Sequence, residues 1–535
     1  MFASVLSATI LGMEVCPVQV EADVSDGLPS FTMVGFPSTQ VKEAQDRVRT
    51  ALKNNGIALP PKRITVNFAP ADIRKEGAGF DMPVAAAILA AAGILKPEFL
   101  SGVMMAGEIS LNGEIHAISG ILPIVIRARE LKCRFCMIPY GNLREGRLIR
   151  DMEVIGVRNL KEMVQFLRDP VSFHERISEE ARGKKESGEG TEEEAAERES
   201  GEGTEEEAAE RETGEETVDF SDIRGQESLR RAMEIAVSGF HNLLMIGPPG
   251  AGKTMIARRI PSIMPALTFE ESLELTKIYS IAGLLSSGNP FIRRRPFRSP
   301  HHTCTPHALA GGGKNPRPGE VTLAHRGVLF LDEMPEFSRR SLEILRQPLE
   351  DKVIRISRVN GTYDFPASFI LCAAMNPCPC GYYPDMNRCS CSAGEVAHYL
   401  GKISQPLLDR IDLCAEAPLL DFSSLRGGRT GESSESIRVR VEAAREIQRQ
   451  RYLHENVGFN GELAGSQVEK YCQIDGAAES LLKRSFDKMP FSARSYHRIL
   501  KVARTIADMD GSSDIRERHV GEALSYRPFD KKYWN

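Results

Sequence analysis

The sequence lacks the features of membrane and secreted proteins. Its longest apolar run, residues 84–95, is interrupted by Gly93 and is too short to cross a bilayer. No basic residue precedes the mild apolar run at the N-terminus, so we expect no signal peptide. The eleven cysteines are an odd number, and five fall within residues 372–391, which does not suit a secreted disulfide framework. We therefore expect a soluble, cytoplasmic protein with reduced thiols or a metal site.

One acidic segment dominates the net charge of −5. Residues 186–216 hold fifteen glutamates against two arginines, and the sequence ESGEGTEEEAAER occurs twice, at Glu186–Arg198 and Glu199–Arg211. Such a segment repels itself and has little to bury, so residues 170–217 are predicted to be a solvated linker rather than an acidic mimic of nucleic acid. The remaining chain is weakly basic, which permits a polyanionic partner without proving one.

The length of 535 residues suggests three or four domains. Residues 1–169 mix strand-like runs, at 64–68 and 135–138, with an alanine-rich helix at 82–92, which predicts an α+β domain. Within it, GEISLNGEI at residues 107–115 predicts a hairpin whose Asn112–Gly113 pair forms a type I′ turn.

The part after the linker has two patterns. Residues 218–431 alternate strands with helices, which is typical of a mostly parallel α/β sheet. Residues 432–535 are expected to form a helical lid, because apolar residues recur at helical spacing from Tyr496 to Ile506. The fold class is therefore α/β, with an α+β domain before it and a helical domain after it.

The strongest chemical signal is GPPGAGKT at residues 247–254. It follows a short apolar strand, residues 243–246, and opens a helix, which is the context that a phosphate-binding loop requires. Its backbone N–H groups and the helix N-terminus favour phosphate. We expect Lys253 to reach the β- and γ-phosphates of ATP and Thr254 to bind Mg²⁺. The other loop residues expected to contact the nucleotide are Gly247, Pro248, Pro249, Gly250, Ala251 and Gly252.

Two further apolar strands end in polar residues. Residues 328–331 precede Asp332 and Glu333, which predicts a Walker B element in which Asp332 holds Mg²⁺, directly or through water, and Glu333 acts as the general base. A third strand, residues 369–374, ends at Asn376, whose amide resembles the sensor-1 group that orients the attacking water.

A four-cysteine motif follows Asn376 directly. Its spacing is C-x-C-x8-C-x-C, with prolines and a glycine for tight turns. Four thiolates so close together are suited to a structural, tetrahedral zinc site, although the spacing is tighter than in the usual C-x₂-C knuckle. Reduced, unliganded thiols or a redox pair are the alternatives. The four residues are Cys378, Cys380, Cys389 and Cys391.

Two basic segments are candidates for contact with DNA. One lies between the two nucleotide motifs and contains Arg293, Arg294 and Arg295, and the other contains Lys352, Arg355 and Arg358, just before the third strand. Contact of such residues with phosphates would be independent of base sequence and sensitive to salt. A solvated basic surface, or pairing at a subunit interface, is the alternative.

The chain from residue 218 to 527 resembles the Mg-chelatase-like AAA+ ATPases, and in particular the ComM/YifB family. The stretches that carry the resemblance include RGQESLRRAMEIAVSGFHNLLMIGPPGAGKTMIARRIPSIMP, FRSPHHT, GGGKNPRPGEVTLAHRGVLFLDEMPEF and AAMNPCPCG. The N-terminal domain matches the same family, so only the acidic repeat is particular to this sequence.

The resemblance implies a homo-oligomeric ring of six subunits with ATP sites at the subunit interfaces. Arg410, in LLDRIDL, matches the arginine-finger position of related helicases and chelatases; its alternative is a salt bridge to Asp409 or Asp412. Arg494 fits the sensor-2 position of the lid, with Arg498 as the alternative. In related helicases the two basic segments form loops that line the central pore.

Residues 102–142 resemble the proteolytic domain of Lon, but the catalytic dyad is missing. The position of the Lon lysine falls on Leu122 and that of the serine on Gly79, and no serine occurs between Ser38 and Ser101. Leucine cannot act as a base, and glycine cannot act as a nucleophile. We therefore expect a Lon-like fold without protease chemistry, serving assembly or DNA entry.

Three functions are compatible with these features. The resemblance implies an ATP-driven motor that acts on single-stranded or branched DNA, in helicase or branch-migration activity during natural transformation or recombination. The alternatives are a chelatase-type ATPase that remodels a partner enzyme, and a protein-remodelling ATPase. Salt-dependent DNA binding would separate the first function from the other two.

Overall fold

The computed structural model describes residues 1–169, 218–286, 288–358, 361–419, 431–488, 492–527 and Tyr533. The predicted linker and its acidic repeat lie outside the described residues. The chain divides into two compact units. One consists of Met1–Thr217 with Thr276–Ile292, and the other of Val218–Leu275 with Arg293–Asn535.

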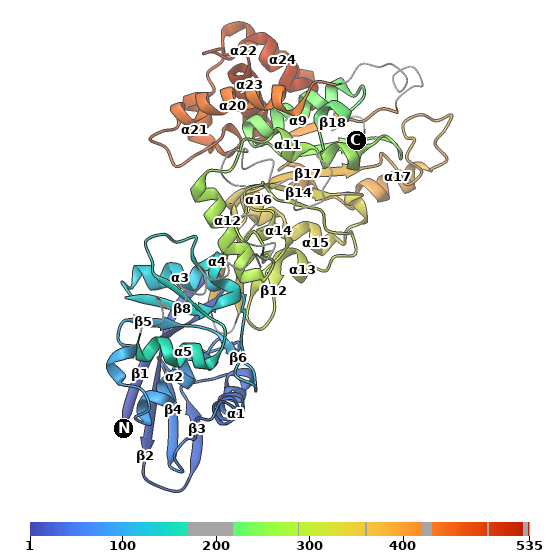
Figure 1. The fold of residues 1–535 in the computed structure, drawn as a ribbon. Helices are drawn as coiled ribbons and strands as arrows, with labels where there is room; N and C mark the ends of the chain where they lie inside the picture. Colours follow the sequence, from blue (N-terminus) through green and yellow to red (C-terminus); the bar gives the residue numbers. More distant parts are fainter. Residues whose placement is uncertain are drawn as a thin grey trace, which may run out of the picture. The chain divides into compact units, whose positions relative to one another are not determined.

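The first unit is built on a seven-stranded mixed sheet in the order β3-β4-β2-β1-β5-β8-β9. The pairs β1–β2 and β2–β4 are antiparallel and the other neighbours are parallel. Figure 1 shows β1 to β4 as blue strands. The strands are β1 (Phe2–Leu11), β2 (Glu14–Ser25), β3 (Ser30–Val34), β4 (Arg63–Ala69), β5 (Val103–Met105), β8 (Phe135–Pro139) and β9 (Val154–Val157).

The alanine-rich helix α2 (Asp81–Ala91) lies at the centre of this unit and is buried along its whole length. Its small side chains let it pack against β1 and β2, as expected for a helix that is apolar on all sides. The one charge in it, Asp81, accepts hydrogen bonds of 2.8 and 2.9 Å from Arg47. The other helices are α1 (Thr39–Asn54), α3 (Ile121–Glu130), α4 (Leu143–Gly146) and α5 (Leu160–Arg168).

The predicted hairpin exists, but the predicted turn type is wrong. The strands β6 (Glu108–Ile109) and β7 (Ile115–His116) pair in antiparallel fashion. A type I′ turn requires positive φ at two successive residues, whereas in this pair only Gly113 has positive φ, at 92°. Asn112 Oδ1 accepts a hydrogen bond from the Glu114 N–H at 3.1 Å, and this local bond stabilises a longer loop that Ser110 closes by donating to the Glu114 carbonyl.

The segment Thr276–Ile292 packs with the N-terminal domain, which the sequence did not suggest. It contains the end of helix α12 (Phe269–Ala282). Ser280 Oγ donates a 2.5 Å hydrogen bond to the buried carboxylate of Glu145, and the Ser280 carbonyl accepts one from the Gly120 N–H. Arg144 also donates to the Gly288 carbonyl at 2.9 Å. Residues from the middle of the chain therefore complete the first unit.

The second unit contains a five-stranded, fully parallel sheet in the order β11-β14-β17-β10-β18. The predicted strands are confirmed: β10 and β14 have the predicted bounds, and β17 is shifted by one residue. The strands are β10 (Leu243–Ile246), β11 (Phe297–Arg298), β14 (Val328–Leu331), β17 (Ile370–Met375) and β18 (Leu413–Glu416).

Short helices connect these strands, because each parallel neighbour requires a crossover. They are α9 (Glu227–Gly239), α10 (Lys253–Ala257), α11 (Ile260–Ile263), α13 (Pro306–Ala310), α14 (Glu320–Leu323), α15 (Arg339–Ile344), α16 (Arg346–Asp351), α17 (Ala393–Leu400) and α18 (Gln405–Leu408).

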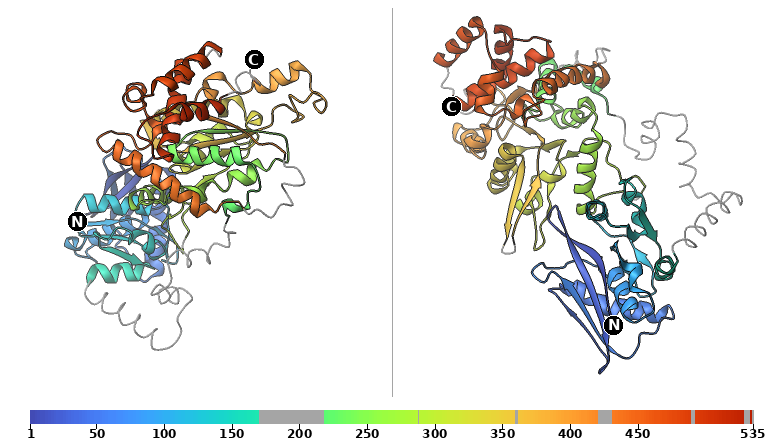
Figure 2. Two further views of the ribbon diagram at one scale, coloured as in Figure 1. Left: turned by 90° about the horizontal axis from the view of Figure 1, so that it is seen from above. Right: turned by 90° about the vertical axis from the view of Figure 1, so that its left-hand side faces the viewer.

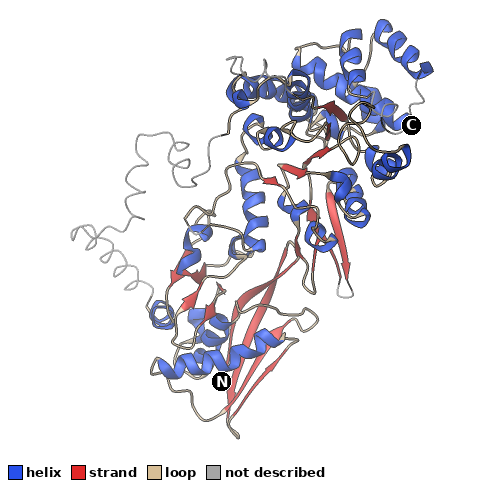
Figure 3. Cartoon of the chain, turned by 90° about the vertical axis from the view of Figure 1, so that its right-hand side faces the viewer, coloured by secondary structure: helices blue, strands red, loops and turns tan. Residues whose placement is uncertain are grey.

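Two small ribbons stand apart from the main sheet. β12 (Gly311–Gly312) pairs with β13 (Arg317–Pro318). β15 (Val353–Arg358) pairs along its full length with β16 (Gly361–Pro366), and Figure 3 shows this hairpin as a two-stranded red ribbon. Arg355 and Arg358 of the second basic segment therefore lie on a β-hairpin.

The C-terminal region is helical, as predicted, with α20 (Ser434–Arg451), α21 (Gly465–Tyr471), α22 (Gly476–Lys488), α23 (Ala493–Met509) and α24 (Glu517–Ser525). Figures 1 and 2 show these orange and red helices next to the green helices α9 and α11. One apolar core joins them to the sheet, and Ile499, Ala503 and Ile506 of α23 lie in it. Within the described residues, no helix is both long enough and apolar enough to span a membrane.

Candidate active site

The parallel sheet brings the three predicted nucleotide motifs to one edge. β17 lies between β10 and β14, so the carboxyl ends of the three strands are neighbours. The phosphate loop follows β10, the Asp332–Glu333 pair follows β14, and Asn376 follows β17. Ligands of open α/β sheets bind at this edge.

Lys253 connects two of these motifs. Its ammonium donates hydrogen bonds to the carbonyls of Gly247 (2.7 Å) and Pro248 (2.9 Å) and to Asn376 Oδ1 (3.1 Å). Burial lowers the pKa of this ammonium, while the nearby charges of Asp332 and Glu333 oppose the shift. The lysine therefore lies inside the phosphate loop and beside the predicted sensor-1 amide.

The two residues predicted to hold Mg²⁺ are in direct contact. Thr254 Oγ1 donates a 2.5 Å hydrogen bond to Asp332 Oδ2, and Asp332 Oδ1 accepts one from the Glu333 N–H at 3.0 Å. A hydroxyl and a carboxylate are hard oxygen ligands of the kind that Mg²⁺ prefers. The chemistry of this pair therefore fits a Mg²⁺ ion.

Glu333 differs from Asp332 in its surroundings. Its backbone has a φ of 50°, an uncommon conformation outside glycine, and its side chain is 57% exposed. His302, in the loop after β11, places Nδ1 3.8 Å from Glu333 Oε2. This contact could not be predicted from the sequence, because the two residues follow different strands and are far apart in the chain.

Arg410 follows α18 and makes contacts within its own chain. Nη2 forms an ion pair with Glu350, and Nη1 donates to the Pro406 carbonyl at 2.6 Å. Neither of the alternative partners is used in this way: Asp409 pairs with Arg498, and Asp412 lies 3.7 Å from His241. Arg410 therefore has a carboxylate partner that the sequence did not indicate.

The two sensor-2 candidates occupy different environments. Arg498 is buried and donates to the carbonyls of Leu408 (3.2 Å) and Ile411 (2.9 Å) as well as to Asp409. Burial lowers its pKa to about 10. Arg494, at the start of α23, is exposed, and its guanidinium has no hydrogen-bond or ion-pair partner among the residues that the structure describes. The hydrogen bonds of Arg498 thus stabilise the fold, whereas the exposed side chain of Arg494 is able to bind a ligand.

The four cysteines of the C-x-C-x8-C-x-C motif converge. Their sulfur atoms all lie within 4.8 Å of one another, with Cys378–Cys380 at 3.3 Å, Cys380–Cys389 at 3.5 Å and Cys378–Cys389 at 3.8 Å. Four thiolates about 2.3 Å from a tetrahedral zinc ion would lie about 3.8 Å apart. A hydrogen bond from the Tyr382 backbone lowers the pKa of the Cys380 thiol to about 6, whereas contact with Cys380 and Cys378 raises the pKa of Cys389 and Cys391, so one thiol of the group ionises most readily.

This cysteine knuckle, residues 378–391, touches the phosphate loop. Gly381 has a φ of 86°, and a Cβ atom at this position would lie 2.4 Å from Pro249 Cδ. A cavity of about 280 Å³ lies beside the contact and is lined by Gly247, Pro248, Tyr382, Tyr383 and Tyr533, among others. Gly381 packs against Pro249 of the phosphate loop, so the knuckle borders the nucleotide site.

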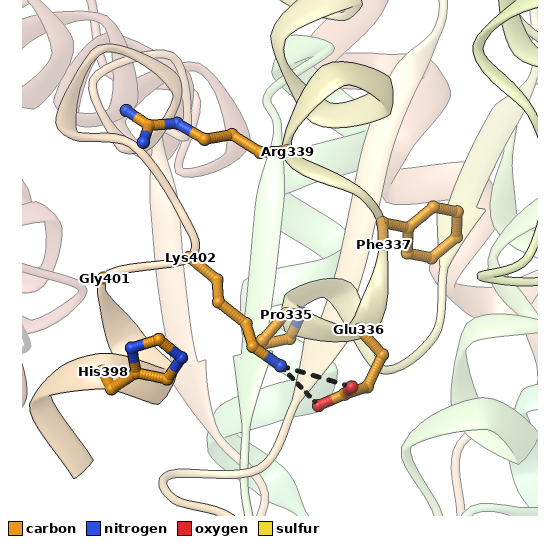
Figure 4. A pocket seen from close by; sticks show the side chains of 7 residues that line it. All are labelled: Pro335, Glu336, Phe337, Arg339, His398, Gly401 and Lys402. Carbon is orange, nitrogen blue, oxygen red and sulfur yellow. Dashed lines mark hydrogen bonds and ion pairs between the residues drawn. The ribbon is translucent and has the colours of Figure 1, made fainter. Parts of the chain in front are cut away.

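Another cavity, of about 500 Å³, does not belong to that site. It lies beside the short turn η5 (Met334–Glu336), and Figure 4 shows its lining residues. Lys402 Nζ is 3.2 Å from Glu336 Oε1, so the carboxylate in the cavity is already paired. None of the predicted nucleotide or metal ligands lines it; the residues that do are Pro335, Glu336, Phe337, Arg339, His398, Gly401 and Lys402.

The candidate DNA residues divide into exposed and partly buried side chains. Arg355 and Arg358 are exposed on the β15–β16 hairpin, where Arg355 pairs with Asp364 across the strands. The Lys352 ammonium instead lies 5.7 Å from the centre of the Phe240 ring, and burial lowers its pKa.

In the other basic segment, Arg293 and Arg294 are exposed. Arg295 is not: its guanidinium donates to the carbonyls of Pro265 and Arg326 and to Glu271. Lys352 and Arg295 are therefore used inside the protein.

The Lon-like domain carries no dyad at the aligned positions. Leu122 is buried in α3, and its N–H donates to Glu145 at 2.8 Å. Gly79 has no side chain, and a Cβ atom added there would lie 3.0 Å from Ile118 Cδ1. Neither position supplies a base or a nucleophile.

Comparison with known proteins agrees with this architecture. Three family profiles match: "Magnesium chelatase, subunit ChlI" over residues 219–425, "Subunit ChlI of Mg-chelatase" over 20–142, and "Magnesium chelatase, subunit ChlI C-terminal" over 431–527. Competence protein ComM of Haemophilus influenzae is 40% identical over 526 residues, which cover 98% of this chain and 97% of that protein. The chain belongs to the ComM/YifB family of Mg-chelatase-like AAA+ ATPases.

Other relatives extend the comparison. The uncharacterized protein YifB of Escherichia coli is 40% identical over 522 residues, covering 97% of this chain and 96% of that protein. Lon protease 2 of Bacillus subtilis is 30% identical over 149 residues, covering 27% of this chain and 26% of that protein. The predicted fold class, with a Lon-like domain, a parallel AAA+ sheet and C-terminal helices, is therefore confirmed.

Proposed function

We propose that this ComM homologue is a ring-forming ATPase that couples ATP hydrolysis to movement along DNA, in helicase or branch-migration activity during natural transformation or recombination in the cytoplasm. The observation that carries the ATPase part is the convergence of Lys253, Thr254, Asp332 and Asn376 at one sheet edge. The DNA part rests on near full-length similarity to a relative named as a competence protein, together with the exposed arginines of the hairpin.

Each residue at the sheet edge has a distinct role in this proposal. Lys253 exchanges the carbonyls of Gly247 and Pro248 for the β- and γ-phosphates, while Thr254 and Asp332 hold Mg²⁺. Mg²⁺ supplies charge neutralisation on the phosphates when bound. Asn376 orients the attacking water, and the exposed carboxylate of Glu333 accepts its proton.

The oligomer is part of the proposal. Members of this family of AAA+ proteins typically oligomerise, and we propose a hexameric ring with ATP at the subunit interfaces. Arg410 of one subunit then stabilises the charge that develops on the phosphates bound to its neighbour. Arg494, exposed at the start of α23, supplies the sensor-2 cation from the lid.

We assign the four-cysteine knuckle to structural zinc, held by Cys378, Cys380, Cys389 and Cys391. Sulfur atoms within 4.8 Å of one another suit the tetrahedral geometry, and four protein thiolates leave no open position for catalysis. The ion stabilises the turn that places Gly381 against Pro249. Zinc therefore stabilises the phosphate loop indirectly, through the contact between Gly381 and Pro249.

We assign DNA contact to Arg355 and Arg358 of the hairpin and to the exposed Arg293 and Arg294. Lys352 and Arg295 are left out, because their side chains are partly buried, whereas the four assigned arginines are exposed. Contacts of guanidinium groups with phosphates are independent of base sequence, as a motor that moves along DNA requires.

A chelatase-type function is the second candidate, because all three family profiles are named after magnesium chelatase. Such an ATPase would act on a protein partner and would not need the hairpin arginines. DNA binding and its dependence on salt separate the two functions.

The experiment measures binding of the full chain to a labelled single-stranded oligonucleotide across a range of salt concentrations. We expect tight, salt-sensitive binding, and a decrease of about 1.4 in the log–log slope when Arg355→Ala and Arg358→Ala remove two phosphate contacts. Arg449→Ala, at an exposed arginine of α20, is the control and leaves the slope unchanged. Robust ATP hydrolysis without any DNA binding would contradict the proposal and favour a protein partner.

A further inference from the structure

Arg410 is held within its own chain in an incompletely satisfied arrangement. Its side chain is 14% exposed and forms an ion pair with Glu350. Nη1 donates to the Pro406 carbonyl, while Nε is buried without a hydrogen-bond partner among the described residues. A buried donor without a partner costs free energy. The guanidinium would therefore be more stable in a position where Nε also forms a hydrogen bond.

The backbone around Arg410 is fixed from both sides. Arg498 of α23 donates to the carbonyls of Leu408 and Ile411, and Asn242 Nδ2 donates to the carbonyl of Arg410 itself at 2.8 Å. The segment therefore cannot shift easily as a whole. Only the Arg410 side chain is able to exchange one anionic partner for another.

Its partner Glu350 lies at the base of the hairpin. Glu350 is in the last turn of α16, and Lys352 ends that helix with a φ of 57°. The Lys352 N–H donates to the Pro348 carbonyl, and the Lys352 carbonyl accepts from the Ala367 N–H, just after β16. Both strands of the hairpin are thus tied to the end of α16, so a force on the hairpin reaches Glu350 directly.

We infer that Glu350 is a positioning residue that holds Arg410 away from the neighbouring subunit until DNA contacts the hairpin. Contact of Arg355 or Arg358 with phosphate displaces the end of α16, and Arg410 leaves the carboxylate for the phosphates of the neighbour's ATP. Guanidinium groups bind carboxylate and phosphate with the same planar set of donors, so one anion replaces the other. This inference rests on the proposed function, in which Arg410 acts in trans and the hairpin contacts DNA.

The test compares full-length wild-type protein with Glu350→Gln by measuring kcat and KM for ATP with and without single-stranded DNA. Release of Arg410 raises the DNA-independent kcat of the variant by roughly two- to five-fold, the change that an ion pair of this exposure supports. KM stays constant, and the ratio of kcat with DNA to kcat without DNA falls toward one. Asp351→Asn is the matched control, because it removes the same charge from the neighbouring position of α16 and keeps the wild-type ratio.

Two results would overturn the inference. The first is a Glu350→Gln variant with the wild-type ratio, and the second is one in which kcat falls equally with and without DNA. Arg410→Ala, measured in the same assay, separates this failure from failure of the proposed function. If Arg410→Ala abolishes turnover while Glu350→Gln keeps the wild-type ratio, only the role of Glu350 is wrong. If Arg410→Ala leaves turnover unchanged, the trans-acting arginine itself is wrong, and the inference is overturned with it.

Discussion

Thr254 Oγ1 donates a 2.5 Å hydrogen bond to Asp332 Oδ2, although the two residues are 78 positions apart in the sequence. The contact exists because the two strands that precede them, β10 and β14, both flank β17 and run parallel to it. The hydroxyl and the carboxylate that we assign to Mg²⁺ are therefore held together by the sheet itself.

Asp332→Asn is expected to weaken the binding of Mg²⁺ together with ATP. Loss of the carboxylate removes a negative oxygen from the Thr254 pair, so the Mg²⁺ concentration for half-maximal ATP binding rises by about 10- to 100-fold. Titration of Mg²⁺ against a fluorescent ATP analogue measures this. Glu333→Gln is the matched control and keeps the wild-type midpoint; an unchanged midpoint for Asp332→Asn would remove that residue from the metal site.

Purified protein is expected to contain about one zinc ion per subunit. Cys380→Ser removes one of four ligands, so it should lose the metal and lower the melting temperature, since a structural zinc site contributes directly to folding stability. Elemental analysis and thermal unfolding check both effects. Cys304→Ser, at a cysteine outside the knuckle, retains the metal. Zinc absent from protein purified without chelators would contradict the assignment.

Gly381→Ala is expected to weaken ATP binding through the phosphate loop. The new methyl group would lie 2.4 Å from Pro249 Cδ, and a left-handed backbone costs a non-glycine residue about 1–2 kcal/mol. Calorimetric titration with ATP and thermal unfolding measure the two effects. Gly394→Ala, where an added Cβ meets nothing within 4 Å, is the control. Wild-type affinity in Gly381→Ala would show that the knuckle and the loop are not coupled.

Arg498→Ala is expected to lower folding stability, whereas Arg494→Ala is expected to lower ATP turnover. Arg498 is buried against Asp409, and removal of one partner of such a pair costs about 3–5 kcal/mol of folding stability. Arg494 is exposed, so Arg494→Ala keeps the melting temperature and lowers ATP turnover. Denaturant unfolding combined with an ATPase assay distinguishes the two. Normal turnover in Arg494→Ala would leave the sensor-2 position unassigned.

The strands at the nucleotide site could be predicted from the sequence because their signals are local. Four-residue apolar runs become fully buried parallel strands, as in residues 243–246 and 328–331. The convergence of the four cysteines could also be predicted from the sequence, because they lie within fourteen positions of one another. The edge of the sheet at which the nucleotide motifs meet follows from the parallel topology alone.

The features that the sequence did not predict depend on contacts between distant residues. Arg410 pairs with Glu350, sixty positions away, rather than with its neighbours Asp409 and Asp412. Lys352 was predicted to contact DNA together with Arg355 and Arg358, but its ammonium lies against the ring of Phe240. The type I′ turn was wrong because the Asn112 side chain bonds to the local backbone, which a two-residue pattern does not reveal.

The most direct test of the DNA motor uses a labelled four-way junction with wild-type protein and with Glu333→Gln, each with and without ATP. We predict strand separation by wild-type protein only when ATP is present. Glu333→Gln should bind ATP and the junction without separating the strands, because the carboxylate that accepts the proton of the attacking water is gone. Separation by Glu333→Gln at the wild-type rate, or ATP hydrolysis by wild-type protein without any separation, would contradict the account.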